Sequence, residues 1–125
     1  MNYVHIVAAL AILQFFYFGS LVAIARGKYG VNAPATSGHE MFERAYRIHM
    51  NTLEQLVGFL PMLLIAGVYW SHAIIAAIGV VYIVGRFVYQ QAYLADPKTR
   101  TIGFVLSILP TFILLLASIA GVVLQ

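Results

Sequence analysis

Residues 43–65 read ERAYRIHMNTLEQLVGFLPMLLI, so two acids and two arginines lie directly before a long apolar run. Read as a helix, Arg47, Asn51 and Glu54 fall at positions i, i+4 and i+7 and place a cation, an amide and an anion along one stripe. A charge near hydrocarbon is costly unless it finds a partner, and an ionisable group at membrane depth is by default a functional residue. This polar stripe therefore predicts a functional site at one end of a membrane-spanning helix.

The composition places the whole chain in a membrane. Of its 125 residues, 62% are hydrophobic and 9% are charged, and the mean hydropathy is +0.92. A membrane helix needs about 20 apolar residues to cross a hydrocarbon core about 30 Å thick. Three apolar runs reach that length, and a fourth reaches it if it extends back through the charged stripe; the runs are 3–25, 73–94, 102–124 and 55–70. We expect an all-α fold, an integral membrane bundle of four helices.

These runs form a single domain over residues 1–125, with helices at about 3–26, 39–69, 72–95 and 101–124. The segment from Arg26 to Gly30 ends the first helix, and Thr36 or Ser37 caps the second, Ser37 forming a capping box with Glu40. We further expect a kink near Pro61, an interfacial Trp70 and an N-terminal cap at Thr99 for the fourth helix.

Basic residues surround the first and third loops, at positions 26, 28, 44, 47, 98 and 100, whereas the second loop and both tails carry none. The positive-inside rule places those two loops in the cytoplasm and both termini on the opposite side. The charged stripe then faces the cytoplasm, in a bacterial inner membrane or its equivalent. Residues 1–5 lack a basic n-region and no small-residue cleavage site follows, so the first helix is expected to remain.

Several chemistries are excluded. The absence of cysteine removes disulfides, thiolate metal sites and cysteine nucleophiles, so any thiol chemistry must come from a bound ligand. His5, His39 and His72 are dispersed without metal-ligand spacing, so no metal site is expected. The basic residues are few and sit at helix ends, which argues against nucleic-acid binding.

A second stripe, Tyr82, Arg86, Tyr89 and Tyr93, runs along the third helix beside Gln90. Tyrosines can grip a peptide-like ligand with ring face and hydroxyl, although an interfacial aromatic belt is the alternative. Arg86 lies deeper in the membrane than an interfacial belt requires. Its charge therefore needs an acidic side chain as a partner. We expect Glu54 to be its partner, in a structural pair between helices.

Arg100 stands at the start of the fourth helix, where free N–H groups and the helix dipole favour an anion. It is the most anion-stabilising position in the chain; contact with lipid phosphate is the alternative.

Together these motifs resemble the membrane-associated proteins in eicosanoid and glutathione metabolism, the MAPEG family, and among them the microsomal glutathione S-transferases. The resemblance spans the chain from Arg26 through the fourth helix. Its strongest part is Phe42-Glu43-Arg44 through Arg47-x-His49-x-Asn51-Thr52-Leu53-Glu54, supported by Lys28-Tyr29-Gly30-Val31 before it and Gly85-Arg86, Tyr89, Tyr93 and Arg100 after it.

The resemblance implies a homotrimer of four-helix subunits that binds glutathione between neighbours near the cytoplasmic face. In that reading Arg47 holds a glutathione carboxylate, Asn51 meets the peptide backbone and Glu54 meets the α-amino group. Arg26 reaches in from the adjacent subunit. His49 is a packing or hydrogen-bonding residue at the subunit interface rather than a general base.

Tyr89 and Tyr93 match the family tyrosines that contact the tripeptide, and Arg100 matches the catalytic arginine beside the sulfur, with Thr101 as a second donor. Two departures from the sequences of relatives narrow the range of expected activities. Gly27 replaces a second basic residue of leukotriene C4 synthase, and Met50 replaces an arginine of prostaglandin E synthase. A third, Gln55 where some relatives have tyrosine, loosens one contact.

The expected function is that of a detoxifying glutathione transferase that conjugates the thiolate to hydrophobic electrophiles, with reduction of lipid hydroperoxides as a second reaction. Two alternatives stay open. One is a catalytically silent protein that binds glutathione or lipid. The other is a small multidrug-type transporter, which needs an acid embedded in the membrane. This alternative is disfavoured because the acids lie beside arginines at the cytoplasmic end and the first helix contains no acid.

Overall fold

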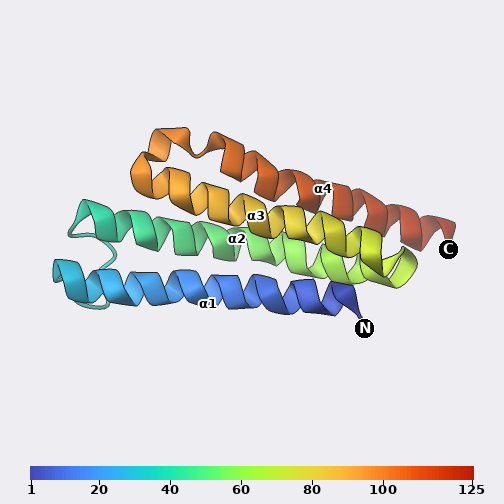
Figure 1. Ribbon diagram of the computed structural model, residues 1–125, viewed down its shortest axis with the longest axis horizontal. Helices are drawn as coiled ribbons and strands as arrows, with labels where there is room; N and C mark the ends of the chain where they lie inside the picture. Colours follow the sequence, from blue (N-terminus) through green and yellow to red (C-terminus); the bar gives the residue numbers. More distant parts are fainter.

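Four long helices run side by side in the computed structural model, which describes residues 1–125 (Figure 1). They are α1 (Tyr3–Tyr29), α2 (Glu40–Tyr69), α3 (His72–Ala95) and α4 (Thr101–Leu124), with a short 3₁₀ turn, η1 (Pro97–Thr99), before α4. Each is long and apolar enough to cross a membrane. The chain is therefore an all-helical, multi-pass integral membrane protein, as predicted.

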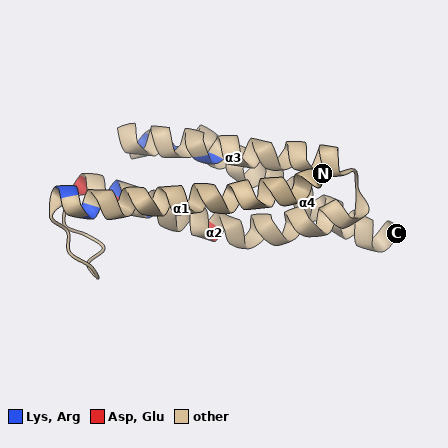
Figure 2. Cartoon of the chain, turned by 60° about the horizontal axis from the view of Figure 1, so that its bottom comes forward, with Lys and Arg blue, Asp and Glu red and all other residues tan.

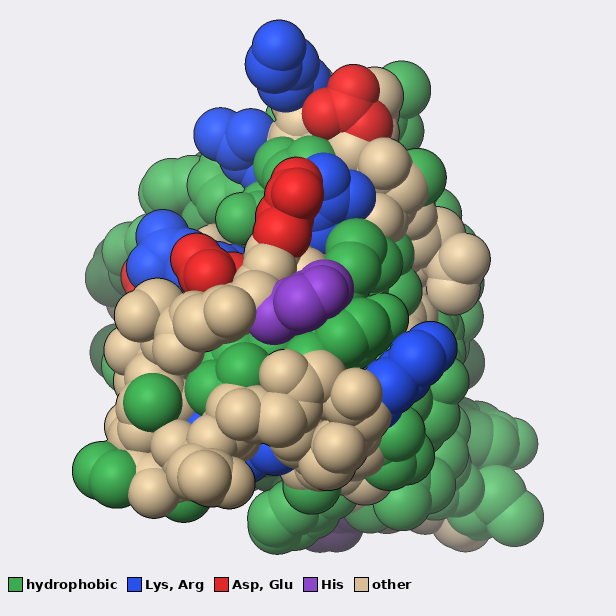
Figure 3. Space-filling model, turned by 90° about the vertical axis from the view of Figure 1, so that its left-hand side faces the viewer, with side chains coloured by type: hydrophobic (Ala, Val, Ile, Leu, Met, Phe, Trp, Pro, Cys, Tyr) green, Lys and Arg blue, Asp and Glu red, His purple; other side chains and the backbone are tan.

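Charged residues gather at the end of the bundle that carries the α1–α2 and α3–α4 connections (Figures 1 and 2). Both termini and the α2–α3 turn lie at the other end. Figure 3 looks onto the charged end and shows acidic and basic side chains interspersed around apolar ones. The two connections flanked by basic residues thus share one end of the bundle.

The first helix is longer than expected. Arg26 lies within α1, which continues to Tyr29 and ends at Gly30 with a φ of 70°. Glycine adopts this left-handed conformation without the penalty that a Cβ brings, and it commonly follows the last helical residue. The helix therefore ends within the predicted segment from Arg26 to Gly30, three residues beyond the predicted boundary at about residue 26.

The predicted caps of α2 and α4 are also wrong. Neither Thr36 nor Ser37 caps α2, because His39 occupies that position and its Nδ1 accepts a hydrogen bond from the Met41 N–H at 3.1 Å. The residue before α4 is Arg100, not Thr99. Thr99 lies in the 3₁₀ turn and donates its hydroxyl to carbonyls of the preceding segment.

Helices α3 and α4 pack backbone against backbone at the charged end. A Cβ added at Gly103 of α4 would overlap the backbone nitrogen and Cα of Tyr89 on α3. A Cβ added at Gly85 of α3 would lie 2.6 Å from the carbonyl carbon of Leu106 on α4. Small residues allow such close approach in membrane bundles. As a result, the first turn of α4 lies directly against Tyr89.

Candidate functional site

Arg86 is completely buried and joins three helices at the centre of the predicted site. Its Nη2 donates to Asn51 Oδ1 at 2.8 Å and to Thr52 Oγ1 at 3.0 Å, both on α2. Its Nη1 donates to Ser107 Oγ on α4 at 3.3 Å. Thr52 and Ser107 were not among the predicted site residues. The requirement that a buried arginine find several acceptors is the signal that would have pointed to them.

The predicted ion pair between Arg86 and Glu54 is wrong. The single ion pair of the structure joins Arg44 and Glu40, and Glu54 lies on the exposed face of α2. Neutral oxygens accept from both terminal nitrogens of Arg86 and an aromatic ring faces its guanidinium, while its buried Nε has no hydrogen-bond partner. Glu54 is thereby left available for a different partner.

The hydrogen bond from Arg86 fixes the role of Asn51. An asparagine amide has one accepting oxygen and one NH₂ group with two donors. Because Oδ1 accepts from Arg86, the Nδ2 group is the part of Asn51 that can bind a ligand, as a donor. A peptide carbonyl or a carboxylate is its natural complement.

Tyr89 connects this centre to the charged end. Its ring lies 4.4 Å from the Arg86 guanidinium carbon, in cation–π geometry, and it stacks on Tyr93 with 5.5 Å between ring centroids. The first turn of α4 packs against the backbone of Tyr89 at Gly103. Arg86, which also binds Asn51 of the first stripe, therefore meets Tyr93 and the first turn of α4 at one tyrosine.

Arg100 and Thr101 are exposed at the start of α4. With Lys98 and Phe104 they line a surface pocket of about 510 Å³. Arg100 Nη1 donates to the Pro97 carbonyl at 2.6 Å, which holds the side chain near the free N–H groups of the helix. Backbone dipole and guanidinium together make this pocket favourable for an anion.

Arg26 and His49 do not join this cluster within one protomer. Arg26 Nη1 donates to Ala35 O at 2.7 Å and to Val31 O at 3.5 Å, which ties the α1–α2 loop to α1. His49 stacks on Phe15 of α1 with 4.5 Å between ring centroids. No group of three or more histidine, aspartate or glutamate side chains is arranged to hold a metal ion.

The sequence model of the MAPEG family matches residues 4–120. The chain belongs to the MAPEG family. It is 38% identical over 120 residues to an uncharacterized protein of Synechocystis, covering 96% of this chain and 88% of that one. It is 38% identical to microsomal glutathione S-transferase 2 of Homo sapiens, covering 82% and 69%. It is 36% identical to leukotriene C4 synthase of Bos taurus, covering 75% and 63%.

Replacing Arg86 with lysine tests how much the buried hydrogen bonds of Arg86 stabilise this MAPEG chain. Lysine keeps the charge but presents a single ammonium in place of the planar fork that reaches three oxygens and the Tyr89 ring. We expect Arg86→Lys to lower the free energy of unfolding by about 2 kcal/mol. Denaturant titration in micelles, followed by Trp70 fluorescence, measures this.

The matched control is Arg47→Lys, because Arg47 is exposed and makes no hydrogen bond within the protomer. It should change the free energy of unfolding by less than about 0.5 kcal/mol. Equal losses in the two variants would contradict a special structural role for Arg86.

Proposed function

We propose that this chain is a membrane-bound glutathione transferase whose cradle is formed by Arg47, Asn51, Glu54, Tyr89, Tyr93 and Arg100. The observation that carries the proposal is the convergence on Tyr89 of Arg86, which holds Asn51, together with Tyr93 and the first turn of α4. Membership of the MAPEG family supports it, as does the name of the human relative, a glutathione S-transferase.

The donors and acceptors of the cradle complement glutathione, an anionic tripeptide with two carboxylates, an ammonium and a thiol. Arg47 pairs with one carboxylate, and Asn51 Nδ2 donates to a peptide carbonyl. Glu54, which has no ion pair within the chain, accepts from the ammonium. Tyr89 and Tyr93 supply ring faces and hydroxyls along the peptide. The charged end faces the cytoplasm, from which glutathione arrives.

The assembly proposed is the homotrimer that the family resemblance implies, in which a neighbouring copy covers a face that is exposed in a single protomer. Glu54 is exposed on α2, and so are Val57 at 71% and Val68 at 76% on the same face. A carboxylate left facing lipid is costly, so a neighbouring copy covers this face. Arg26 binds its own loop through Nη1 alone, which leaves Nη2 free to reach a neighbour's glutathione. His49 contributes packing near this interface.

Arg100 stabilises the thiolate, which is the reactive form of the ligand. A free thiol with a pKa of about 8.5 is mostly protonated at neutral pH, and lowering that pKa to about 6.5 takes about 2.7 kcal/mol. A guanidinium at a helix N-terminus supplies such stabilisation, with the Thr101 hydroxyl as a second donor. The thiolate sulfur attacks an apolar electrophile from the lipid side, forming a thioether and displacing a leaving group. With a lipid hydroperoxide it attacks the terminal oxygen and breaks the O–O bond, which gives the lipid alcohol, after protonation by water, and a glutathione sulfenic acid. A second glutathione then converts the sulfenic acid to the disulfide and water.

Asn51→Asp tests the glutathione cradle without removing the hydrogen bond from Arg86 to residue 51. The new carboxylate still accepts from Arg86, but the donating NH₂ group is lost and a negative charge faces the peptide. We expect glutathione affinity to fall about tenfold or more, measured by calorimetry on the detergent-purified protein. Asn32→Asp in the exposed α1–α2 loop is the control and should leave affinity unchanged.

Turnover is tested on the same preparation with 1-chloro-2,4-dinitrobenzene and with a lipid hydroperoxide. Conjugation with the first, or reduction of the second, is the expected result. Glutathione binding with neither reaction would contradict the proposed transferase and identify a silent binding protein. Absence of glutathione binding would contradict the cradle itself.

A further inference from the structure

Ser107 is the residue of α4 whose side chain hydrogen-bonds to the buried Arg86. Its Oγ accepts from Arg86 Nη1 at 3.3 Å and donates to the Gly103 carbonyl at 2.7 Å. Because Arg86 Nη2 donates to Asn51 and Thr52, these bonds form one continuous network across α2, α3 and α4. One end of the network is Asn51, which belongs to the proposed cradle. The other end is the first turn of α4.

Arg100 lies on the same face of α4 as this serine. The buried residues of α4 recur at helical spacing and form one stripe, namely Gly103, Ser107, Pro110, Leu114, Ser118 and Gly121. Arg100 precedes Gly103 by three positions and Ser107 by seven, so it continues this stripe at the charged end. Seven residues of helix correspond to about 10 Å along the axis. A rotation or shift of α4 at Ser107 therefore also moves Arg100.

The bond between Arg86 and Ser107 is the only hydrogen bond that joins α3 to α4. The backbones of these helices also approach closely at Gly85 and Gly103. Small residues permit such an approach, but van der Waals contacts lack the directional preference of a hydrogen bond. Arg86 directly follows Gly85, so the hydrogen bond lies within this close contact. It is therefore the directional contact that sets how α4 is turned against α3.

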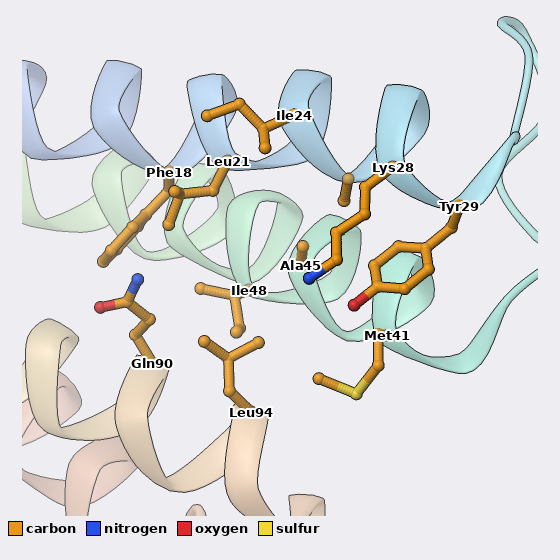
Figure 4. Close-up of a pocket in the computed structure, with 11 residues that line it drawn as sticks. Phe18, Leu21, Ile24, Lys28, Tyr29, Met41, Ala45, Ile48, Gln90 and Leu94 are labelled. Atoms are coloured by element: carbon orange, nitrogen blue, oxygen red, sulfur yellow. The ribbon is translucent and has the colours of Figure 1, made fainter.

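Helix α3 is less closely held on its α1 side. Gln90 and Leu94 face α1 and α2 there across a pocket of about 280 Å³ with a mostly apolar lining (Figure 4). The hydrogen bond between α1 and α3 lies farther along the bundle, from Gln14 Nε2 to the Ile83 carbonyl at 2.9 Å. The cradle face of α3 is therefore positioned by its contacts with α2 and α4.

We propose that Ser107 is a positioning residue for Arg100, the residue that stabilises the thiolate. Through Arg86, the Ser107 hydroxyl fixes the start of α4 relative to Asn51, so that the guanidinium of Arg100 meets the sulfur while Asn51 holds the peptide. A displacement of about 1 Å can cost about a hundredfold in rate. This role rests on the proposed transferase function and adds to it a buried residue that touches neither substrate.

The test is Ser107→Ala, with the pKa of bound glutathione read from thiolate absorbance across a pH series. The full chain is used in detergent. Alanine removes the acceptor for Arg86 and the donor to the Gly103 carbonyl. We expect the thiol pKa to rise by about one unit, from about 6.5, which lowers the thiolate fraction at pH 7 about threefold. The kcat with 1-chloro-2,4-dinitrobenzene should fall about threefold or more.

Glutathione affinity separates the two ends of the network. At pH 5.5 the bound thiol is protonated in the natural chain and in Ser107→Ala, so stabilisation of the thiolate no longer contributes to binding. Affinity at this pH should therefore differ by less than about twofold between them. Calorimetry on the same preparations measures it.

Ser118→Ala is the matched control, because Ser118 is a second buried serine of α4. Its hydroxyl also donates to the carbonyl four residues earlier, that of Leu114, at 2.7 Å, and it bonds to the Met62 carbonyl of α2 at 3.1 Å. It makes no contact with Arg86. Both variants should be less stable than the natural chain. Only Ser107→Ala should change the thiol pKa and kcat.

An unchanged thiol pKa in Ser107→Ala would overturn the proposal, as would an equal change in Ser118→Ala. A large loss of affinity at pH 5.5 would also overturn it, because Ser107 would then support peptide binding rather than Arg100. If the natural chain itself does not lower the thiol pKa, the proposed transferase fails and this role fails with it. A lowered pKa that Ser107→Ala leaves intact removes the role of Ser107 alone.

Discussion

Arg100→Met should reduce the fraction of bound glutathione present as thiolate at pH 7 about 25-fold, which is the change produced when a thiol pKa returns from about 6.5 to about 8.5. The physical reason is the loss of the guanidinium beside the N-terminus of α4, where Arg100 is held by the Pro97 carbonyl. Thiolate absorbance at the ultraviolet edge, recorded across a pH series, measures it. In the variant the absorbance should rise about two pH units higher.

The affinity for glutathione changes far less in Arg100→Met than the thiolate fraction does. A thiol whose pKa is lowered on binding gains affinity only above the lowered pKa, so at pH 7 the linked loss is about fourfold. Lys28→Met is the control for a lost cation at the charged end, because Lys28 lies outside the Arg100 pocket, and it should affect neither quantity. Equal losses of thiolate and affinity in Arg100→Met would mean that Arg100 only binds glutathione and does not activate its sulfur.

Gly103→Ala should lower the free energy of unfolding by about 3 kcal/mol, because overpacking against backbone forces a helix to move. The new methyl group would overlap the backbone of Tyr89, which cannot rotate away as a side chain can. Helix α4 must therefore shift from α3. Denaturant titration in micelles measures the loss, and Trp70 reports the shift, because its indole N–H donates to the Ala117 carbonyl of α4 at 2.8 Å.

Gly27→Ala is the matched control for this substitution. Gly27 lies in α1, and a Cβ there would meet nothing within 4 Å. Alanine is favoured over glycine in a helix by about 0.5–1 kcal/mol, so this variant should be slightly more stable than the natural chain. Similar effects of the two substitutions would contradict the close packing of α3 on α4.

The helices were predictable because long apolar runs in a membrane protein have one structural solution. Their ends were not, because several polar residues compete to satisfy the same terminal N–H groups. Before α2, the sequence offers Thr36, Ser37 and His39 within four positions, and tertiary packing selects His39, whose ring stacks on Tyr29. That contact joins the last residue of α1 to the residue before α2 and leaves no local signature.

The two polar stripes were also predictable, since helical periodicity alone places Arg47, Asn51 and Glu54 on one face. The partner of Arg86 was not. Charge matching favoured Glu54, but the rotation of α2 relative to α3 presents Asn51 and Thr52 instead, and α4 adds Ser107. Sequence periodicity defines the faces of each helix but not how one helix is turned against the next.

The coordination of Arg86 by hydroxyl and amide oxygens has an electrostatic consequence. These dipoles solvate the guanidinium, yet no carboxylate cancels its unit charge. In a poorly polarisable interior the resulting potential is weakly screened and extends towards the opening beside Tyr89. An incoming anion is drawn inward along this gradient, whereas a cationic solute of the same size is repelled before it makes any contact.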